Sequence, residues 1–273
     1  MTEWPLIIFT LLLQTAIGIY LWSTLIKSRN KSGDFKKNTV LVFILSVLSM
    51  IISLAHLGVP IRAYAAIFNL GSSWLSREIF FTGLFTGMVF IDLFVNRMEN
   101  ISESFIKTWS WLTSIIGIAT VFAIAQIYMN SMMPAWQSSN TMIDFYATTI
   151  IMGGIVFLLI SRKEITTGLT GICLTVLAVA LLQVVFLPVF LTELGSGNAA
   201  AQSSIALLAQ NKGVMAIQWL LVLAGIFLLI FWKMDDKQGQ NYIYVSAISL
   251  LVGQIIGRYL FYAAGVSLGF GLM

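Results

Sequence analysis

The sequence predicts an all-α integral membrane protein of eight transmembrane helices, with both termini on the outer (periplasmic) side. Of its 273 residues, 59% are hydrophobic and only 10% are charged, whereas a soluble domain carries about 25% charged residues. Apolar segments recur along the whole chain, and about 20 apolar residues span a bilayer as an α-helix. We therefore expect a single membrane domain over residues 1–273.

Charged or turn-forming residues bound each of the eight apolar segments. The segments cover residues 4–26, 39–59, 75–95, 108–131, 141–160, 166–191, 213–232 and 242–270. The second is expected to stop at Gly58 and Pro60, because proline lacks an amide hydrogen and disfavours helix in the residue before it. The stretch "GSGNAA", 195–200, is too short for a phosphate-binding glycine loop and is expected to be an outer turn.

Loop charges set the expected orientation. Eleven of the 15 Lys and Arg residues lie in the loops 27–38, 96–107, 161–165 and 233–241, all on one side. Cytoplasmic loops carry the excess of Lys and Arg. The chain is therefore expected to be a multi-pass protein of the bacterial inner membrane with both termini outside the cytoplasm.

Ionisable residues cluster between the second and third segments. His56, the only histidine, lies near the outer end of the second segment, Arg62 and Arg77 lie in the connection, and Glu78 lies about one turn into the third. Charges inside a membrane are costly and normally face a cavity or a partner. A structural ion pair with charges at the interface is one interpretation. A proton-accepting pair, His56 and Glu78, is the other, and we favour it.

A second polar stripe lies on the last segment, on the same outer side. Gln254, Arg258 and Tyr262 are spaced at i, i+4 and i+8, so they share one helix face. Arg258 lies in the outer part of the membrane and is expected to pair with Glu78 or with Asp144 of the fifth segment.

The counts of cysteine and histidine exclude several redox centres within this chain. Cys173 is the only cysteine, so neither an internal disulfide nor a cysteine-ligated iron–sulfur cluster forms here. One histidine cannot provide both ligands of a bis-histidine haem, and a metal site would rest on one imidazole. We expect no haem, metal or cluster. Proton acceptance beside an apolar pocket remains, which is the chemistry that a quinol requires.

Several motifs carry a resemblance to a known family. They are "EWPLIIFT" at 3–10, "HLGVPIRA" at 56–63, "LGSSWLSREI" at 70–79, "IYMNS" at 127–131 and "IGRYLFY" at 256–262. With these motifs the chain resembles, over essentially its whole length, the membrane anchor subunit of bacterial dimethyl sulfoxide reductase, the DmsC family.

The resemblance implies a heterotrimer in anaerobic respiration. A molybdopterin catalytic subunit and an iron–sulfur subunit would dock on the periplasmic face, and menaquinol would be oxidised near that face. The family's functional histidine and acidic residue match His56 and Glu78, and Arg62 matches the arginine of the histidine motif. We expect His56 to accept a quinol proton and Glu78 to orient it or relay the proton. Arg62, Arg258 and Tyr262 complete the expected quinol site.

Three alternatives remain open from the sequence. A transporter or channel for ions or anions would continue its polar residues to the inner surface, where Asp92 is the main candidate. A purely structural anchor would use the charges only for docking and would have no quinol site. A polysulfide reductase-type anchor would share the quinol chemistry and differ in its partner.

Overall fold

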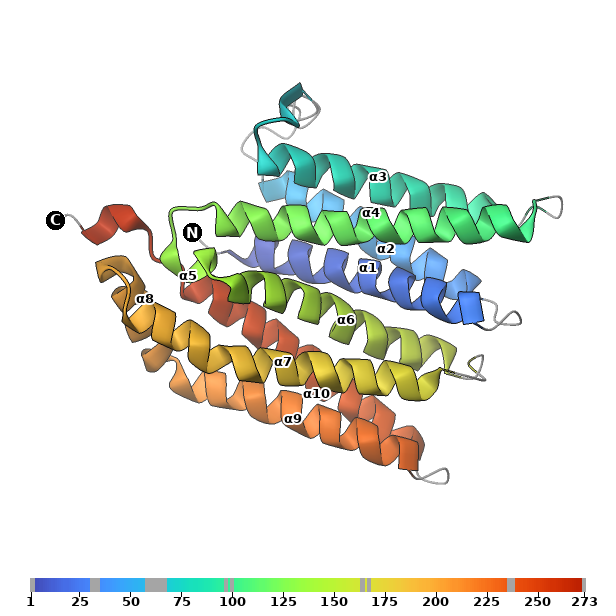
Figure 1. The fold of residues 1–273 in the computed structure, drawn as a ribbon. Coiled ribbons are helices and arrows are strands. Elements are labelled where there is room, and N and C mark those ends of the chain that lie inside the picture. Colours follow the sequence, from blue (N-terminus) through green and yellow to red (C-terminus); the bar gives the residue numbers. More distant parts are fainter. Residues whose placement is uncertain are drawn as a thin grey trace. The chain divides into compact units, whose positions relative to one another are not determined.

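The computed structural model describes residues 3–29, 35–56, 68–95, 98, 101–162, 165, 168–234 and 239–271. The described residues form helices and their connections, with no β-strand among them (Figure 1). The helices are α1 (Trp4–Arg29), α2 (Lys36–His56), α3 (Trp74–Val95), α4 (Glu103–Met129), α5 (Pro134–Gln137), α6 (Ser139–Ser161), α7 (Leu169–Gly195), α8 (Ala199–Gln210), α9 (Lys212–Met234), α10 (Gly239–Ala263) and the 3₁₀-helix η2 (Leu268–Gly271).

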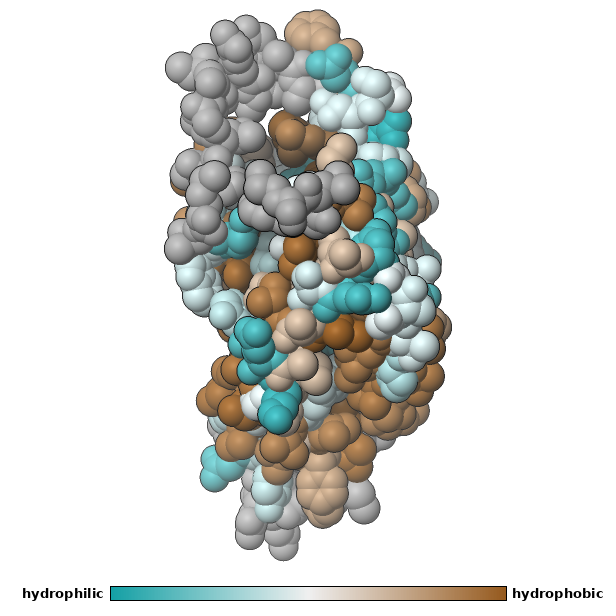
Figure 2. Space-filling model, turned by 90° about the vertical axis from the view of Figure 1, so that its left-hand side faces the viewer, coloured by the Kyte–Doolittle hydropathy of each residue, from teal (hydrophilic) through white to brown (hydrophobic). Residues whose placement is uncertain are grey.

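Eight of these helices are long and apolar enough to cross a membrane, which confirms the predicted number of spans. They are α1, α2, α3, α4, α6, α7, α9 and α10. The orientation of the termini stays a prediction. Many large apolar side chains on α7 and α9 are exposed, as expected of surfaces that face lipid. Figure 2, which views one end of the helices, shows hydrophilic residues interleaved with hydrophobic ones.

The last predicted span, 242–270, was too long. The helix α10 ends at Ala263, and η2 follows separately. Gly265 lies just beyond this end, its amide bonds to the Tyr262 carbonyl, and the Leu268 amide bonds to the Met132 carbonyl. Glycine after a helix favours its termination, so the apolar residues after Ala263 do not extend the span.

The short helices α5 and α8 were not predicted. The expected turn at 195–200 is confirmed, since residues 196–198 connect α7 to α8, and α8 starts within this stretch. That the turn lies on the outer side stays a prediction. Asn198 caps α8, because its side-chain oxygen accepts a hydrogen bond from the Ala201 amide.

Contacts divide the chain into two compact units. Unit 1 comprises Met1–Ile124 and Met152–Ile172, and unit 2 comprises Ala125–Ile151 and Cys173–Met273. That residues 1–273 act as one domain stays a prediction.

In unit 1, α1 is the most buried helix and packs against α2. A Cβ atom on Gly153 of α6 would lie 2.3 Å from the Gly18 Cα atom of α1, so these two helices touch through their backbones. The side chain of Asn38 on α2 donates hydrogen bonds to the Ser23 and Ser161 hydroxyls, at 3.2 and 2.8 Å. Close packing and buried polar contacts thus hold α1, α2 and the end of α6 together.

In unit 2, α9 and α10 run side by side (Figure 1) and form the most extensive helix pair. A Cβ atom on Gly257 would lie 2.5 Å from the Gln218 amide nitrogen. Glycine at this position therefore lets Gln218 of α9 approach the α10 backbone. This close approach places Gln218 beside Arg258.

Candidate functional site

Glu78 lies four residues into α3, near the end of unit 1 that carries the N-terminus. The helix starts at Trp74 because the Ser73 hydroxyl accepts a hydrogen bond from the Ser76 amide, at 3.3 Å. Four residues advance about 6 Å along a helix. Glu78 is only 6% exposed, so its carboxyl group lies inside the packed helices, about one turn from the end of α3.

Glu78 lines a pocket within unit 1 that has about 330 Å³ of empty volume, including its mouth. The lining residues come from the first part of α1, the last part of α2 and the first part of α3: Phe9, Met50, Ser53, Leu54, Glu78, Ile79 and Thr82. The pocket is mainly apolar, with polar groups contributed by a serine, a threonine and the carboxyl group. Such a lining suits an apolar ring that carries hydrogen-bonding groups.

The polar groups of α3 in this pocket are available to a ligand within the described part of the chain. No hydrogen bond or ion pair joins the Glu78 carboxyl group to another described residue, and the buried Thr82 hydroxyl also has no hydrogen-bond partner there. Buried polar groups in native proteins are nearly always hydrogen-bonded. A carboxyl and a hydroxyl group one helical turn apart therefore form a receptive polar edge on an apolar pocket.

The neighbouring Arg77 is engaged elsewhere. Its guanidinium group donates hydrogen bonds to the Leu70 and Gly71 carbonyls, both at 2.8 Å, and lies 4.1 Å from the centre of the Trp74 ring. These contacts fix the segment before α3. Arg77 thus stabilises the entry to the helix.

Of the predicted site residues, His56 can be placed only in part and Arg62 not at all. His56 is the last residue of α2, three residues beyond the pocket residue Ser53; its side chain lies outside the described residues. Arg62 lies outside them entirely. The pairing of His56 with Glu78 stays a prediction.

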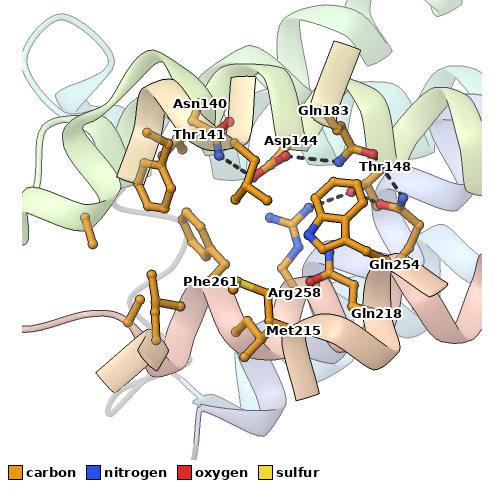
Figure 3. Close-up of a pocket in the computed structure, with 18 residues that line it drawn as sticks. Asn140, Thr141, Asp144, Thr148, Gln183, Met215, Gln218, Gln254, Arg258 and Phe261 are labelled. Atoms are coloured by element: carbon orange, nitrogen blue, oxygen red, sulfur yellow. Dashed lines mark hydrogen bonds between the residues drawn. The ribbon is translucent and has the colours of Figure 1, made fainter. Parts of the chain in front are cut away.

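Arg258 and Tyr262 belong to unit 2. Arg258 lines a cavity with about 780 Å³ of empty volume, including its mouth, enclosed by α6, α7, α9 and α10 with contributions from α5 and α8. Figure 3 shows the guanidinium group pointing between Asp144 on one side and Gln218 and Met215 on the other. Of the two carboxylates expected as its partner, Asp144 interacts electrostatically with Arg258.

A series of hydrogen bonds surrounds this arginine (Figure 3). Its Nη2 atom donates to the Thr148 hydroxyl at 3.3 Å, and Thr148 donates to Gln254 at 2.9 Å. Gln254 in turn donates to Gln183 at 3.2 Å, and Gln183 donates to Asp144 at 3.0 Å. Asp144 also accepts a hydrogen bond from Asn140 at 2.8 Å. The network links α6, α7 and α10 around Asp144 and Arg258.

Aromatic rings complete the surroundings of Arg258 and Tyr262. The guanidinium carbon of Arg258 lies 3.8 Å from the centre of the Phe145 ring, a cation–π contact. The Tyr262 and Tyr128 hydroxyls are hydrogen-bonded, and the Trp136 indole donates to the Phe261 carbonyl at 2.7 Å. All contacts described for Arg258 and Tyr262 are with other residues of unit 2, and none of them tests quinol binding. That these two residues bind a quinol therefore stays a prediction.

Sequence reasoning missed Gln183 and Thr148 as members of this network. Gln183 is the single amide side chain in α7, one of the two most apolar candidate spans, and a buried amide in so apolar a span was a usable signal. Thr148 gave no such signal, because threonine commonly bonds to its own helix.

Comparisons with known proteins match the sequence over almost its full length. The family model described as "DMSO reductase anchor subunit (DmsC)" matches residues 1–264. The C subunit of the anaerobic dimethyl sulfoxide reductase of Haemophilus influenzae is 29% identical over 275 residues, covering 98% of this protein and 96% of the relative. The corresponding C subunit of Escherichia coli is also 29% identical, with the same coverage. The anaerobic dimethyl sulfoxide reductase subunit YnfH of that organism is 25% identical over 277 residues, covering 99% and 97%. The protein therefore belongs to the DMSO reductase anchor subunit (DmsC) family.

Proposed function

We propose that this protein oxidises a quinol, menaquinol, in the Glu78 pocket and passes the electrons to an iron–sulfur partner subunit. As an anchor subunit of this family it has catalytic and electron-transfer subunits as its partners. The observation that carries the proposal is the buried Glu78 carboxyl group, which lines an apolar pocket and has no hydrogen-bond partner among the described residues.

The lining residues offer apolar contacts to the quinol ring and polar groups to its hydroxyl group. Phe9, Met50 and Ile79 provide apolar contacts for a ring and the first part of its tail, while Glu78 and Thr82 meet a ring hydroxyl. Quinol oxidation releases two electrons and two protons, so the site needs a proton acceptor. A carboxylate or an imidazole accepts protons near neutral pH when its surroundings tune it.

Each predicted residue has a role in this proposal. His56 accepts the proton of one hydroxyl group, and Glu78 orients His56 or relays the proton to the outer water. Arg62 holds the Glu78 carboxyl group ionised or stabilises negative charge on the ring. That Arg258 and Tyr262 also bind the quinol stays a prediction. The electrons leave to the nearest cluster of the partner subunit.

The proposal places the site near the periplasmic face. The pocket lies near the end of unit 1 that carries the N-terminus, because Phe9 of α1 lines it. The excess of positive charge in the opposite loops supports an outward N-terminus. A partner subunit on the periplasmic face would then dock above the pocket.

Quenching of a fluorescent quinol analogue, such as a hydroxyquinoline oxide, by membranes that contain the assembled complex tests the proposal. Native complex should bind the analogue stoichiometrically, whereas His56→Ala and Glu78→Gln should lose binding and quinol oxidation. Glu193→Gln is the matched control, since Glu193 is exposed at the end of α7 and lines neither cavity. Unchanged binding and turnover in the His56 and Glu78 variants would instead favour a purely structural anchor.

A further inference from the structure

Unit 1 has a second pocket, lined mainly by polar residues, between the end of α1 and the start of α4. It has about 1020 Å³ of empty volume, including its mouth. The end of α1 lines it with Thr24, Lys27 and Ser28, which share one helix face at i, i+3 and i+4. The start of α4 lines it with Glu103, Ser104, Lys107, Ser110 and Trp111, again one face of a helix. Two polar helix faces therefore meet around this space.

The pocket is closed at its deep end. The Ser114 hydroxyl of α4 donates a hydrogen bond to the Thr24 hydroxyl of α1 at 3.0 Å, and the two residues are 1% and 4% exposed. At that level the helices are in contact. The mouth is at the helix ends, where Ser28, Glu103 and Lys107 are exposed.

The level of the pocket is that of lipid headgroups. Both α1 and α4 are candidate membrane spans, and Lys27 lies two residues before the end of α1 whereas Lys107 lies in the second turn of α4. Residues at the ends of spans meet the interface between hydrocarbon and water, where tryptophan is enriched. Trp111 lines the deeper part of the pocket, as expected of an interfacial tryptophan.

The charges and donors of the pocket match a phosphate group. Among the described residues that line the pocket, Lys27 and Lys107 carry positive charge and Glu103 carries negative charge, so this described lining has a net positive charge. Lysine binds phosphate as a point charge, and the hydroxyl groups of Ser28 and Ser104 add hydrogen-bond donors. The side chains of Ile106 and Trp111 offer apolar contact to the glycerol and the first acyl carbons.

We propose that this pocket binds the phosphate headgroup of an anionic phospholipid such as phosphatidylglycerol. Basic pockets between membrane-spanning helices bind anionic headgroups. The assignment is independent of the quinol site, and it does not depend on which side of the membrane the pocket faces.

Native mass spectrometry of the purified complex, titrated with phosphatidylglycerol or phosphatidylcholine in detergent, tests this assignment. Native complex should retain phosphatidylglycerol in preference to phosphatidylcholine. Lys107→Gln should lower the affinity for phosphatidylglycerol about fivefold, since one basic residue contributes roughly that factor near an anionic headgroup. Glu103→Gln should raise the affinity, because it removes the carboxylate that opposes the phosphate.

Lys37→Gln is the matched control. Lys37 is exposed, belongs to the first turn of α2 in the same unit, and does not line the pocket. Equal affinities in Lys107→Gln, Glu103→Gln and Lys37→Gln would overturn the proposal. Millimolar inorganic phosphate should leave the bound lipid in place; complete displacement would mean that the pocket takes free phosphate, which would overturn the lipid assignment.

Discussion

Two buried carboxyl groups, Glu78 in unit 1 and Asp144 in unit 2, have opposite surroundings. In unit 1, Glu78 is buried at the edge of an apolar pocket, and no described residue contacts its carboxyl group by a hydrogen bond or an ion pair. In unit 2, Asp144 accepts hydrogen bonds from Asn140 and Gln183 and interacts electrostatically with Arg258. A carboxylate enclosed in such a network stabilises the helices around it, whereas one that faces a pocket can serve a ligand.

The energetic reason is the cost of burying charge. A charged group at the centre of a membrane costs roughly 2.5–3.5 kcal/mol on the insertion scale. In unit 2 this cost is offset by the charge pair, the hydrogen bonds and the Phe145 ring. For Glu78 of unit 1, no described residue forms a hydrogen bond or an ion pair with the carboxyl group, which is expected where a ligand supplies the partner of a buried polar group.

The largest expected effect concerns the hydrogen-bond network between Arg258 and Asp144. Arg258→Met should lower the free energy of unfolding by about 3–5 kcal/mol, because it leaves Asp144 buried without its cation. The midpoint of thermal unfolding of the purified complex measures this loss. Asp144→Asn in the same protein should restore part of the stability, since the two residues are coupled. If the single variant unfolds at the native temperature, the network is not what holds unit 2 together.

Glu78→Gln should lower turnover strongly and stability little, the reverse of the effect expected for Arg258→Met. We expect quinol oxidation to fall at least about 100-fold, the lower end of the contribution of a group positioned for proton transfer, while the unfolding temperature changes little. Turnover per assembled complex, measured with a reduced quinol and an artificial acceptor, checks the first part. Loss of stability without loss of turnover per complex would show that Glu78 plays the same structural role as Asp144.

Gly153→Ala tests the close packing of α1 against α6 in unit 1. The new Cβ atom would lie 2.3 Å from the Gly18 Cα atom, so α1 and the end of α6 must separate. Overpacking of this kind costs about 1–3 kcal/mol, and the unfolding temperature should drop accordingly. Gly83→Ala is the control, because no heavy atom lies within 4 Å of its Cβ position. Equal unfolding temperatures for both variants would contradict the close packing of unit 1.

Thr148→Val should give the smallest effect. It removes the hydroxyl that joins Arg258 to Gln254, and interhelical hydrogen bonds in membranes contribute about 0.6 kcal/mol on average. Thr149→Val is the matched control, since the Thr149 hydroxyl bonds only to the Phe145 carbonyl of its own helix among the described contacts. A difference in unfolding temperature between the two variants reports the interhelical bond; its absence would mean that the network tolerates a gap.

The sequence predicted the fold better than the site. Hydropathy and loop charge were enough for the number of spans, because apolar length alone decides which helices cross a membrane. The end of α10 was misjudged, since the apolar residues after Ala263 continue beyond the helix. The short helices α5 and α8 gave no apolar pattern of spanning length.

For the site, the sequence indicated candidate residues, whose role stays a prediction, and left their partners open. The i, i+4 spacing of Gln254 and Arg258 correctly placed them on one face of α10. Which carboxylate interacts with Arg258 depended on tertiary packing, and both Glu78 and Asp144 fitted the sequence. The contributions of Gln183 and Thr148 required knowledge of which faces of α6 and α7 meet α10.

Photocrosslinking of the assembled complex with a photoreactive quinone analogue tests the central claim most directly. Digestion and mass spectrometry then identify the labelled peptides. Labels should fall on the pocket residues of α2 and α3, between Met50 and Thr82, and an excess of unmodified quinone should suppress them. Labels confined to the unit 2 cavity, on Met215 of α9 or Phe261 of α10, would contradict the assignment of the quinol site to Glu78.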